Sequence, residues 1–153
     1  MPLNHILTDT PLVAFAASTN LDRSHAFYGG MLGLRRVEAT PFANVYEAAG
    51  AQLRVTAVVR VARADYTVLG WRVRDLDAAL DALRARGVEF KRYRGVDQDA
   101  AGVWTAPGGS RIAWFEDPDG NTLSLQQPTG DGAADIPPAR GAPHSARGRG
   151  ASE

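Results

Sequence analysis

Most of the chain repeats one pattern of secondary structure, and this repeat constrains the fold more than any other feature. The segment LVAFAAST, followed by NLDRSHAFYGGMLGL, is matched 55 residues later by TVLGWRVR, followed by DLDAALDALRARGV. In each copy, a run of β-branched and aromatic residues typical of a strand precedes an Asx-Leu-Asp sequence typical of a helix start. Two copies at a fixed spacing predict two modules of the same architecture.

Each copy predicts one amphipathic helix. Asn20 and Asp75 are the expected N-caps, because a short side-chain oxygen can accept hydrogen bonds from the first free N–H groups of a helix. In the second helix Leu76 and Leu80 recur at helical spacing. Gly87 is expected to end that helix, since glycine often stands just past a helix C-terminus.

Three short strand candidates follow each helix. They are RRVEAT, ANVYEAA and AQLRVTAVV in the first copy, and VEFKRY, SRIAWFE and NTLSLQQ in the second. Turn residues separate them, and we assign Asp117 and Asp119 of the Asp-Pro-Asp-Gly sequence to turn chemistry rather than to catalysis. Each copy therefore predicts βαβββ, and the whole predicts an α+β fold. We expect one domain over residues 1–128, with modules at about 11–62 and 66–127.

Composition excludes several classes of function. There is no cysteine, which excludes disulfides, thiolate metal sites and a cysteine nucleophile. The 17 basic residues balance 17 acidic ones, so no net charge attracts nucleic acid or an anionic membrane. No apolar run approaches the roughly 20 residues of a membrane span, and the N-terminus lacks a signal-peptide pattern, so we expect a cytoplasmic protein. Residues 129–153, rich in Gly, Pro, Ala and Arg, predict a disordered tail.

Several motifs in a fixed order give the chain a family resemblance. They are Phe27-Tyr28, Leu32-Gly33-Leu34, the Asp75–Leu80 sequence DLDAAL and the terminal run IAWFEDPDGNTLSL. Over residues 11–127 the sequence thereby resembles the vicinal oxygen chelate superfamily, which includes glyoxalase I, bleomycin-resistance proteins and extradiol dioxygenases. The resemblance implies two modules whose curled mixed sheet surrounds a cleft, with the helices outside. In metal-using members, four first-strand and last-strand positions bind a divalent cation through His, Gln or Glu.

These four positions carry no metal ligands in this sequence. Counting from the Phe-Tyr pair and the repeat offset places Val13 and Val68 at the first-strand positions, and the last-strand motifs place Arg54 and Ser124 at the others. Valine cannot coordinate a metal, serine is a poor neutral ligand, and the permanent charge of Arg54 opposes a dication. The three histidines stand outside the expected strands, at positions 5, 25 and 144. We therefore expect neither a metal nor another cofactor.

Strand alternation predicts which side chains share the cleft face with these positions. Together with the resemblance, which adds Trp114 as an aromatic of the pocket, it gives the expected ligand-binding residues Val13, Phe15, Arg54, Val68, Arg72, Trp114, Ser124 and Gln126. Tyr93 and Trp104 are expected to cover the cleft. An apolar cleft with a few polar anchors suits a small organic ligand. The alternative is that the aromatic residues fill the core and the arginines form surface ion pairs.

Three functions remain open from the sequence. The first is a metal-free protein that binds a small organic molecule, as drug-sequestering bleomycin-resistance members do. The second is an enzyme of the same fold, metal-independent or with displaced metal ligands, of the lyase, isomerase or dioxygenase type. Its open acid–base candidates are Glu38, Glu47, Glu89 and Glu116. The third is a non-catalytic interaction protein. By analogy with related folds, we also expect a homodimer.

We predict that the purified protein carries no stoichiometric divalent metal, because Val13, Arg54, Val68 and Ser124 stand at the ligand positions. Elemental analysis after extensive dialysis should find zinc, nickel, manganese and iron each far below one ion per chain. A tightly held ion at about one per chain, lost when these positions are mutated, would overturn the prediction.

Overall fold

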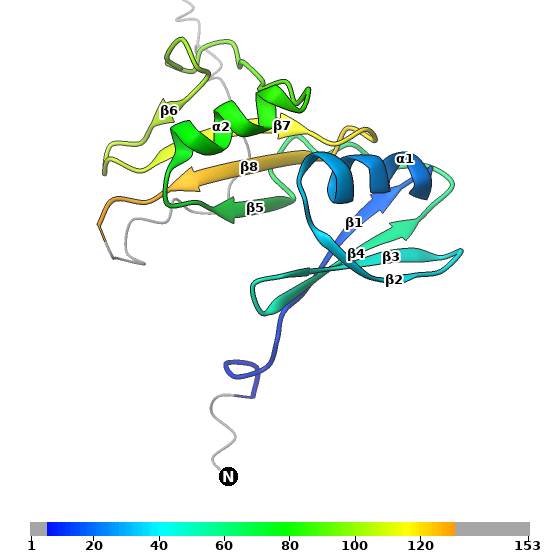
Figure 1. Cartoon of the computed structure of the whole chain (residues 1–153). Coiled ribbons are helices and arrows are strands. Elements are labelled where there is room, and N and C mark those ends of the chain that lie inside the picture. The colour runs from blue at the N-terminus through cyan, green and yellow to red at the C-terminus, as the bar shows by residue number, and fades with distance from the viewer. Residues whose placement is uncertain (1–5, 131–153) are drawn as a thin grey trace, which may run out of the picture. The chain divides into compact units, whose positions relative to one another are not determined.

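The chain divides into two units, each built on a four-stranded mixed sheet. A computed structural model describes residues 6–130, and Figure 1 shows the elements of both units. Of the described residues, unit 1 holds those up to Arg63 and the segment Asp117–Asn121, while unit 2 holds Ala64–Glu116 and those from Thr122 onward. The α+β class expected from the sequence is confirmed. The predicted tail, 129–153, lies almost wholly outside the described residues.

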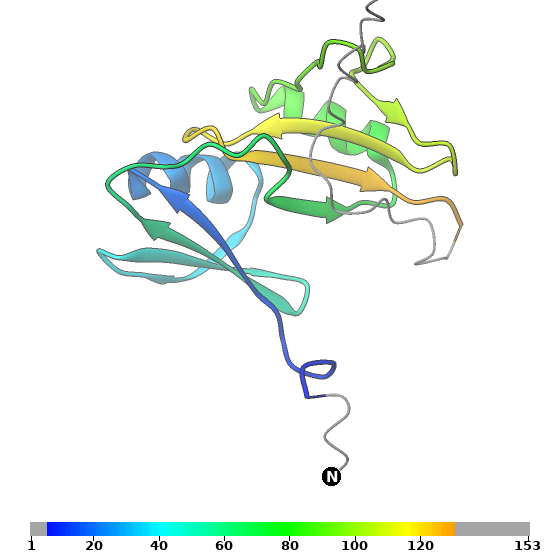
Figure 2. The same cartoon turned by 180° about the vertical axis from the view of Figure 1, so that it is seen from behind.

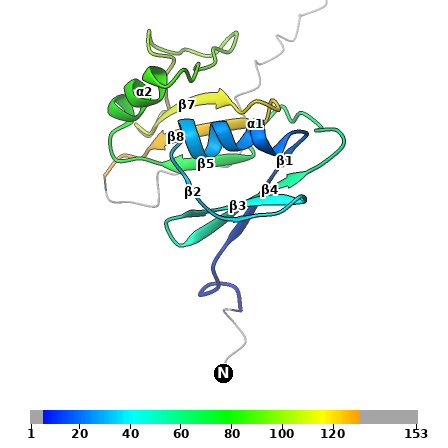
Figure 3. The same cartoon turned by 45° about the vertical axis from the view of Figure 1, so that its right-hand side comes forward.

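Unit 1 is a mixed sheet accompanied by one helical segment. The strand order is β1-β4-β3-β2, with β1 parallel to β4 and the other neighbours antiparallel. The helical segment begins as an α-helix and continues as a π-helix, and it lies above β2, β3 and β4 in Figure 3. The elements are β1 (Val13–Ser18), α1 (Leu21–His25), η2 (Ala26–Met31), β2 (Arg35–Ala39), β3 (Ala43–Ala48) and β4 (Ala51–Ala57).

Unit 2 repeats this plan. Its strand order is β5-β8-β7-β6, with β5 parallel to β8 and the other neighbours antiparallel. The helix α2 lies over one face of the sheet, and Figure 2 shows the opposite face, on which no helix lies. The elements are β5 (Leu69–Arg72), α2 (Leu76–Ala85), β6 (Trp104–Thr105), β7 (Arg111–Glu116) and β8 (Thr122–Gln127).

One expected strand does not form. The segment VEFKRY, residues 88–93, makes only an isolated bridge at Phe90, and β6 takes the place of this strand in the module. The side-chain amide of Gln98 donates to the carbonyl of Lys91 at 2.9 Å and accepts from the N–H of Tyr93 at 2.7 Å. Because a side chain already occupies these backbone groups, they cannot continue a ladder. The strand prediction at 88–93 is therefore wrong.

The helix termini follow the expected chemistry. The side chain of Asn20 accepts from the N–H of Arg23, and that of Asp75 accepts from the N–H of Ala78, both at 3.0 Å. These bonds satisfy donors that have no partner inside the helix. Gly87, just after α2, has φ +93°, a conformation that glycine adopts without steric cost. Among the described residues, neither helix combines the length and hydrophobicity needed to span a membrane.

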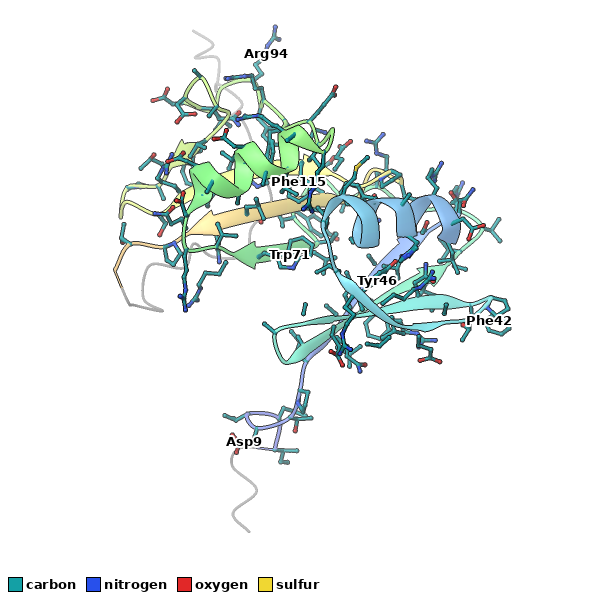
Figure 4. All side chains as sticks on the ribbon, viewed as in Figure 1. Asp9, Phe42, Tyr46, Trp71, Arg94 and Phe115 are labelled. Atoms are coloured by element: carbon teal, nitrogen blue, oxygen red, sulfur yellow. The ribbon has the colours of Figure 1, made fainter. Side chains whose placement is uncertain are left out.

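The core of unit 1 lies between the helical segment and the sheet. Tyr28 on η2 and Tyr46 on β3 are fully buried, with ring centroids 5.9 Å apart, and Figure 4 shows Tyr46 beneath α1. The hydroxyl of Tyr46 shares a 3.0 Å hydrogen bond with Nδ1 of His25. Burial, followed by the charge of Arg36, lowers the pKa of His25, and the opposing charge of Asp22 is the smaller effect. The imidazole is therefore neutral at neutral pH.

The core of unit 2 is an apolar layer between α2 and its sheet. Leu76 and Leu80 of the helix are buried, as the helical spacing predicts. Beneath them Phe115 is fully buried, with ring centroids 6.5 Å from Trp71 and 5.5 Å from Phe90 (Figure 4). This packing fixes which face of the sheet is left without a helix.

The turn between β7 and β8 is the polar centre of unit 1. Oδ1 of Asp117 accepts from the N–H groups of Asp119 and Asn121, both at 2.9 Å. Oδ2 accepts from the Tyr28 hydroxyl at 2.6 Å and from the Asn121 amide at 2.7 Å, and that amide also donates to the Ala17 carbonyl at 2.8 Å. Asp117 is only 5% exposed, so these four donors replace its water. Burial, and then the charge of Asp117, raises the pKa of Tyr28 far above its usual value.

Asp119 joins the same turn to the start of α1. Its Oδ1 accepts from the N–H and the hydroxyl of Thr19, both at 2.9 Å, and from Nη2 of Arg23 at 2.8 Å. Burial raises the pKa of Asp119, but the neighbouring hydroxyl of Ser18, the two Thr19 donors and the charge of Arg23 outweigh it, so the pKa lies below its usual range. Asp119 therefore stays ionised well below neutral pH.

We predict that Tyr28→Phe lowers the free energy of unfolding by about 1–3 kcal/mol, because the buried Asp117 carboxylate loses one donor. Denaturant titration measures the change. Tyr66→Phe is the matched control, since Tyr66 is 57% exposed, and its effect should stay within about 0.5 kcal/mol. Equal effects of the two substitutions would show that the Tyr28–Asp117 bond does not contribute to stability.

Candidate functional site

The predicted site residues fall on the helix-free faces of the two sheets, one group in each unit. In unit 1, Phe15 of β1 pairs with Arg54 of β4 in the parallel ladder, and Val13 pairs with Gln52. Paired residues point to the same face, and alternation puts residues two apart on that face too. We call these four residues the β1–β4 surface. They share a face, as the alternation predicts.

The β1–β4 surface is apolar and carries one cation. Val13 is 44% exposed and Phe15 is 61% exposed, so both present hydrocarbon to water. Arg54 is half-buried, and its guanidinium has no hydrogen-bond or ion-pair partner among residues 6–130. The stem of such an arginine can lie along apolar surface while its guanidinium stays open to a ligand. This surface therefore offers an apolar contact area beside an unpaired positive charge.

The corresponding face of unit 2 contains the other predicted residues. Gly70 pairs with Ser124 and Arg72 with Gln126 in the parallel ladder of β5 and β8, while Trp114 of β7 pairs with Ser124. The hydroxyl oxygen of Ser124 lies 2.8 Å from the point that a Cβ on residue 70 would occupy, so glycine at this position leaves room for it. The remaining predicted residue is Val68, which precedes β5 and donates its N–H to the Thr122 carbonyl at 2.9 Å.

Three aromatic residues meet on this face of unit 2. The ring of Tyr93 stands edge-on to Trp114 with centroids 5.6 Å apart, and Trp104 is tilted against Trp114 at 6.2 Å. We call these three residues the aromatic cluster. Tyr93 and Trp104 thus lie against Trp114, and Trp114 is only 3% exposed. Tyr93 and Trp104 therefore cover the Trp114 ring, and the exposed surface of the cluster belongs to those two residues.

An ion pair at the aromatic cluster was not expected from the sequence. The ammonium of Lys91 contacts the carboxylate of Glu116, and the two side chains are 34% and 26% exposed. The same ammonium lies 5.8 Å from the centroid of the Tyr93 ring. Burial, and then the charge of Glu116, raises the pKa of Tyr93. Alternation from Trp114 places Glu116 on this face, but the position of Lys91 depends on the segment that fails to form a strand.

Gln98 holds the segment that carries two of the three aromatic residues. Besides its bonds to the backbone of Lys91 and Tyr93, its amide donates to the carbonyl of Gly102 at 2.7 Å. The residue also bridges Trp104 through the backbone. One side chain therefore connects the two ends of the segment that bears Tyr93 and Trp104. No spacing or motif in the sequence marks Gln98 for this role.

The ionisable groups of the described residues do not assemble a metal site. No group of three or more His, Asp or Glu among residues 6–130 is arranged to hold a metal ion. His25 is engaged with Tyr46 on the helix side of its sheet, and Glu47 forms an ion pair with Arg35. The metal content itself stays a prediction. The two helix-free faces present apolar surface, aromatic rings and charged groups.

Comparison of the sequence with models of known protein families shows which family the chain belongs to. The sequence model of the Glyoxalase/Bleomycin resistance protein/Dioxygenase superfamily matches residues 3–125. The chain belongs to this superfamily. The resemblance drawn from the motifs is therefore confirmed. No curated protein matches the sequence.

Several solved structures share the fold. A glyoxalase/bleomycin resistance protein/dioxygenase from Alicyclobacillus acidocaldarius matches with a TM-score of 0.63 at 19% identity, over 80% of this chain and 94% of that one. A lactoylglutathione lyase from Agrobacterium tumefaciens matches with 0.61 at 16%, over 78% and 93%. A genomically encoded fosfomycin resistance protein from Listeria monocytogenes matches with 0.60 at 17%, over 76% and 90%. At such identities the likeness shows the fold and not the activity.

We predict that Gln98→Glu disorders the aromatic cluster, because two backbone carbonyls lose a donor and face a carboxylate oxygen instead. Near-ultraviolet circular dichroism should lose much of its tryptophan signal, and the free energy of unfolding should fall by about 1–3 kcal/mol. Gln52→Glu introduces the same charge at an exposed position of unit 1 and should leave the near-ultraviolet spectrum unchanged. An unchanged near-ultraviolet spectrum for Gln98→Glu would contradict the role of Gln98.

Proposed function

We propose that this superfamily member binds a small organic anion, without a metal ion, on the β1–β4 surface. The single observation that carries the proposal is the half-buried residue Arg54, whose guanidinium has no partner among residues 6–130 and which lies beside two exposed apolar side chains. An anionic ligand group supplies the missing acceptor, and its hydrocarbon covers Val13 and Phe15.

The apolar part of the ligand gains from burial. A scattered exposed apolar residue is normal on a protein surface. Val13 and Phe15, however, are two residues apart on one edge strand and share a face, so a single planar ring can cover both. Covering a phenylalanine side chain contributes about 1.5–3 kcal/mol when burial is complete. The partial exposure of Phe15 sets the contribution near the lower end.

The polar part of the ligand is selected by charge. A guanidinium presents donors in a planar fork that matches carboxylates, sulfonates and phosphonates, and such pairs are stronger than neutral hydrogen bonds. Gln52 lies on the same face and offers a neutral amide beside Arg54. The same charge repels a divalent cation, which supports ligand binding that does not use a metal.

Three residues of unit 2 are also proposed as ligand contacts, separate from the β1–β4 surface. They are Arg72, Ser124 and Gln126, on the helix-free face of that sheet. Arg72 is exposed and has no partner among the described residues. Ser124 is 8% exposed, and its hydroxyl stands over Gly70, which has no side chain. These residues suit hydrogen bonding to a neutral or anionic group.

Exposed apolar residues near the N-terminus favour a second candidate function, association with another copy of the chain. Ile6, Leu7 and Leu12 are each more than two-thirds exposed and precede Val13 and Phe15. A run of exposed apolar side chains marks an interaction surface in many proteins. In this alternative the β1–β4 surface is covered by protein, and the expected homodimer is its natural form.

We predict that 8-anilinonaphthalene-1-sulfonate, an aromatic anion, binds with enhanced fluorescence. N-phenyl-1-naphthylamine, which has the same rings without the sulfonate, serves as the neutral probe. Phe15→Ala should weaken both probes by roughly 5–30-fold, which corresponds to about 1–2 kcal/mol of lost apolar contact. Arg54→Met should weaken only the sulfonate, and Arg54→Lys should recover part of the loss.

Two outcomes decide between the candidates. Arg60→Met removes an exposed arginine of unit 1 outside the strands and should leave both probes unchanged. If the Phe15→Ala and Arg54→Met variants bind both probes with the affinity of the unmodified chain, the ligand proposal is wrong. If Phe15→Ala instead halves the mass in sedimentation velocity without changing probe affinity, the surface is an interface between copies.

A further inference from the structure

We propose that unit 2 contains a second ligand site, specific for an organic ammonium ion, which the side chain of Lys91 occupies in the unliganded protein. The site is formed by Glu116 and the aromatic cluster. It lies in the other unit and selects the opposite charge, so it is independent of the anion site proposed above.

The surroundings of the Lys91 ammonium are those of a bound cation. Its nitrogen contacts the Glu116 carboxylate and lies 5.8 Å from the centroid of the Tyr93 ring. A cation within about 6 Å of an aromatic face is attracted by the negative potential of that face. Lys91 is the only lysine of the chain, so the feature is a specific one and not one example of a lysine-rich surface.

The receiving groups are fixed, while the occupant is flexible. The N–H of Lys91 donates to the Trp114 carbonyl at 2.7 Å, and Gln98 holds both the Lys91 carbonyl and the Tyr93 N–H. Glu116 lies in β7, so the sheet fixes its backbone. The lysine side chain, by contrast, ends a four-carbon stem and is 34% exposed. An ion pair this exposed contributes little to stability, so a ligand ammonium can replace it without unfolding the unit.

The nearby charges favour a cation over an anion. Arg92 lies on the same segment, but its guanidinium donates to the carbonyls of Asp99 and Ala100 at 2.8 and 2.6 Å. Arg94 points outward from the unit in Figure 4. The carboxylate of Glu116 lies near the Tyr93 ring, so a ligand cation can contact both groups, as the Lys91 ammonium does. The raised pKa of Tyr93, caused first by burial and then by Glu116, agrees with a negative potential there.

The ligand class follows from this arrangement. A primary ammonium can donate to Glu116 and also lie over Tyr93, whereas a neutral alcohol of the same size offers neither charge nor three donors. A short alkyl or aryl body attached to the nitrogen would contact Tyr93 and Trp104, which are half-buried at the surface of the aromatic cluster. Arylalkylamines and short alkylamines are therefore the expected ligands.

The test is a chemical rescue of the lysine side chain. Lys91→Ala vacates the site, and n-butylammonium chloride restores the missing ammonium and stem as a separate molecule. Tyrosine and tryptophan fluorescence, titrated at constant ionic strength, should show saturable binding at least tenfold tighter in Lys91→Ala than in the unmodified chain. n-Butanol should not bind to either. The double variant Lys91→Ala/Glu116→Gln should bind n-butylammonium at least tenfold more weakly than Lys91→Ala does.

A matched control and a second measurement complete the test. Arg74→Ala removes an exposed positive charge elsewhere in unit 2 and should not increase n-butylammonium binding. In the unmodified chain, selective isotope labelling gives a single lysine signal, and saturating phenethylammonium should shift it as Lys91 leaves Glu116. This measurement needs no variant to fold. Equal affinity of Lys91→Ala and the unmodified chain, or a lysine signal that does not move, would overturn the proposal.

Discussion

The buried carboxylate of Asp117 is the interaction on which unit 1 depends. Four donors converge on its two oxygens, from two backbone N–H groups, the Tyr28 hydroxyl and the Asn121 amide. A carboxylate removed from water is tolerated only when hydrogen bonds replace its hydration. The two N–H groups close the turn, the tyrosine connects η2 to it, and the amide also donates to Ala17 of β1. Helix, turn and first strand are thereby positioned by one charged group.

Both units place their candidate site on the face that this internal packing leaves open. Tyr46 and Phe115 fill the helix side of their sheets, so alternation directs the neighbouring residues to the other side. The two open faces differ in whether their cationic side chain has a partner. Arg54 has no partner among residues 6–130, whereas Lys91 is paired with Glu116 and lies against a ring. The same architecture thus presents an unsatisfied charge in one unit and a satisfied one in the other.

Local signals in the sequence predict the parts of the structure that depend on neighbouring residues. Asn20 and Asp75 cap their helices, and alternation places Phe15 with Arg54, because both effects act over a few positions. The segment 88–93 has the composition of a strand, but the Gln98 side chain forms hydrogen bonds with its backbone. The β-propensity of the segment cannot predict such a bond. For Trp114, the motif identifies the face, but its burial depends on Tyr93 and Trp104, whose contacts are tertiary.

The turn Asp117–Asn121 affects when unit 1 can fold during synthesis, because the turn is made late. Unit 1 includes this turn, and the bond from Thr19 to Asp119 joins positions 100 residues apart. A ribosome adds roughly 5–20 residues per second, so about 3–12 s pass between the emergence of residue 63 and that of residue 121. During that interval the polar centre of the first sheet has no carboxylate. The part of the protein that is made first is therefore completed only after most of the second half has left the ribosome.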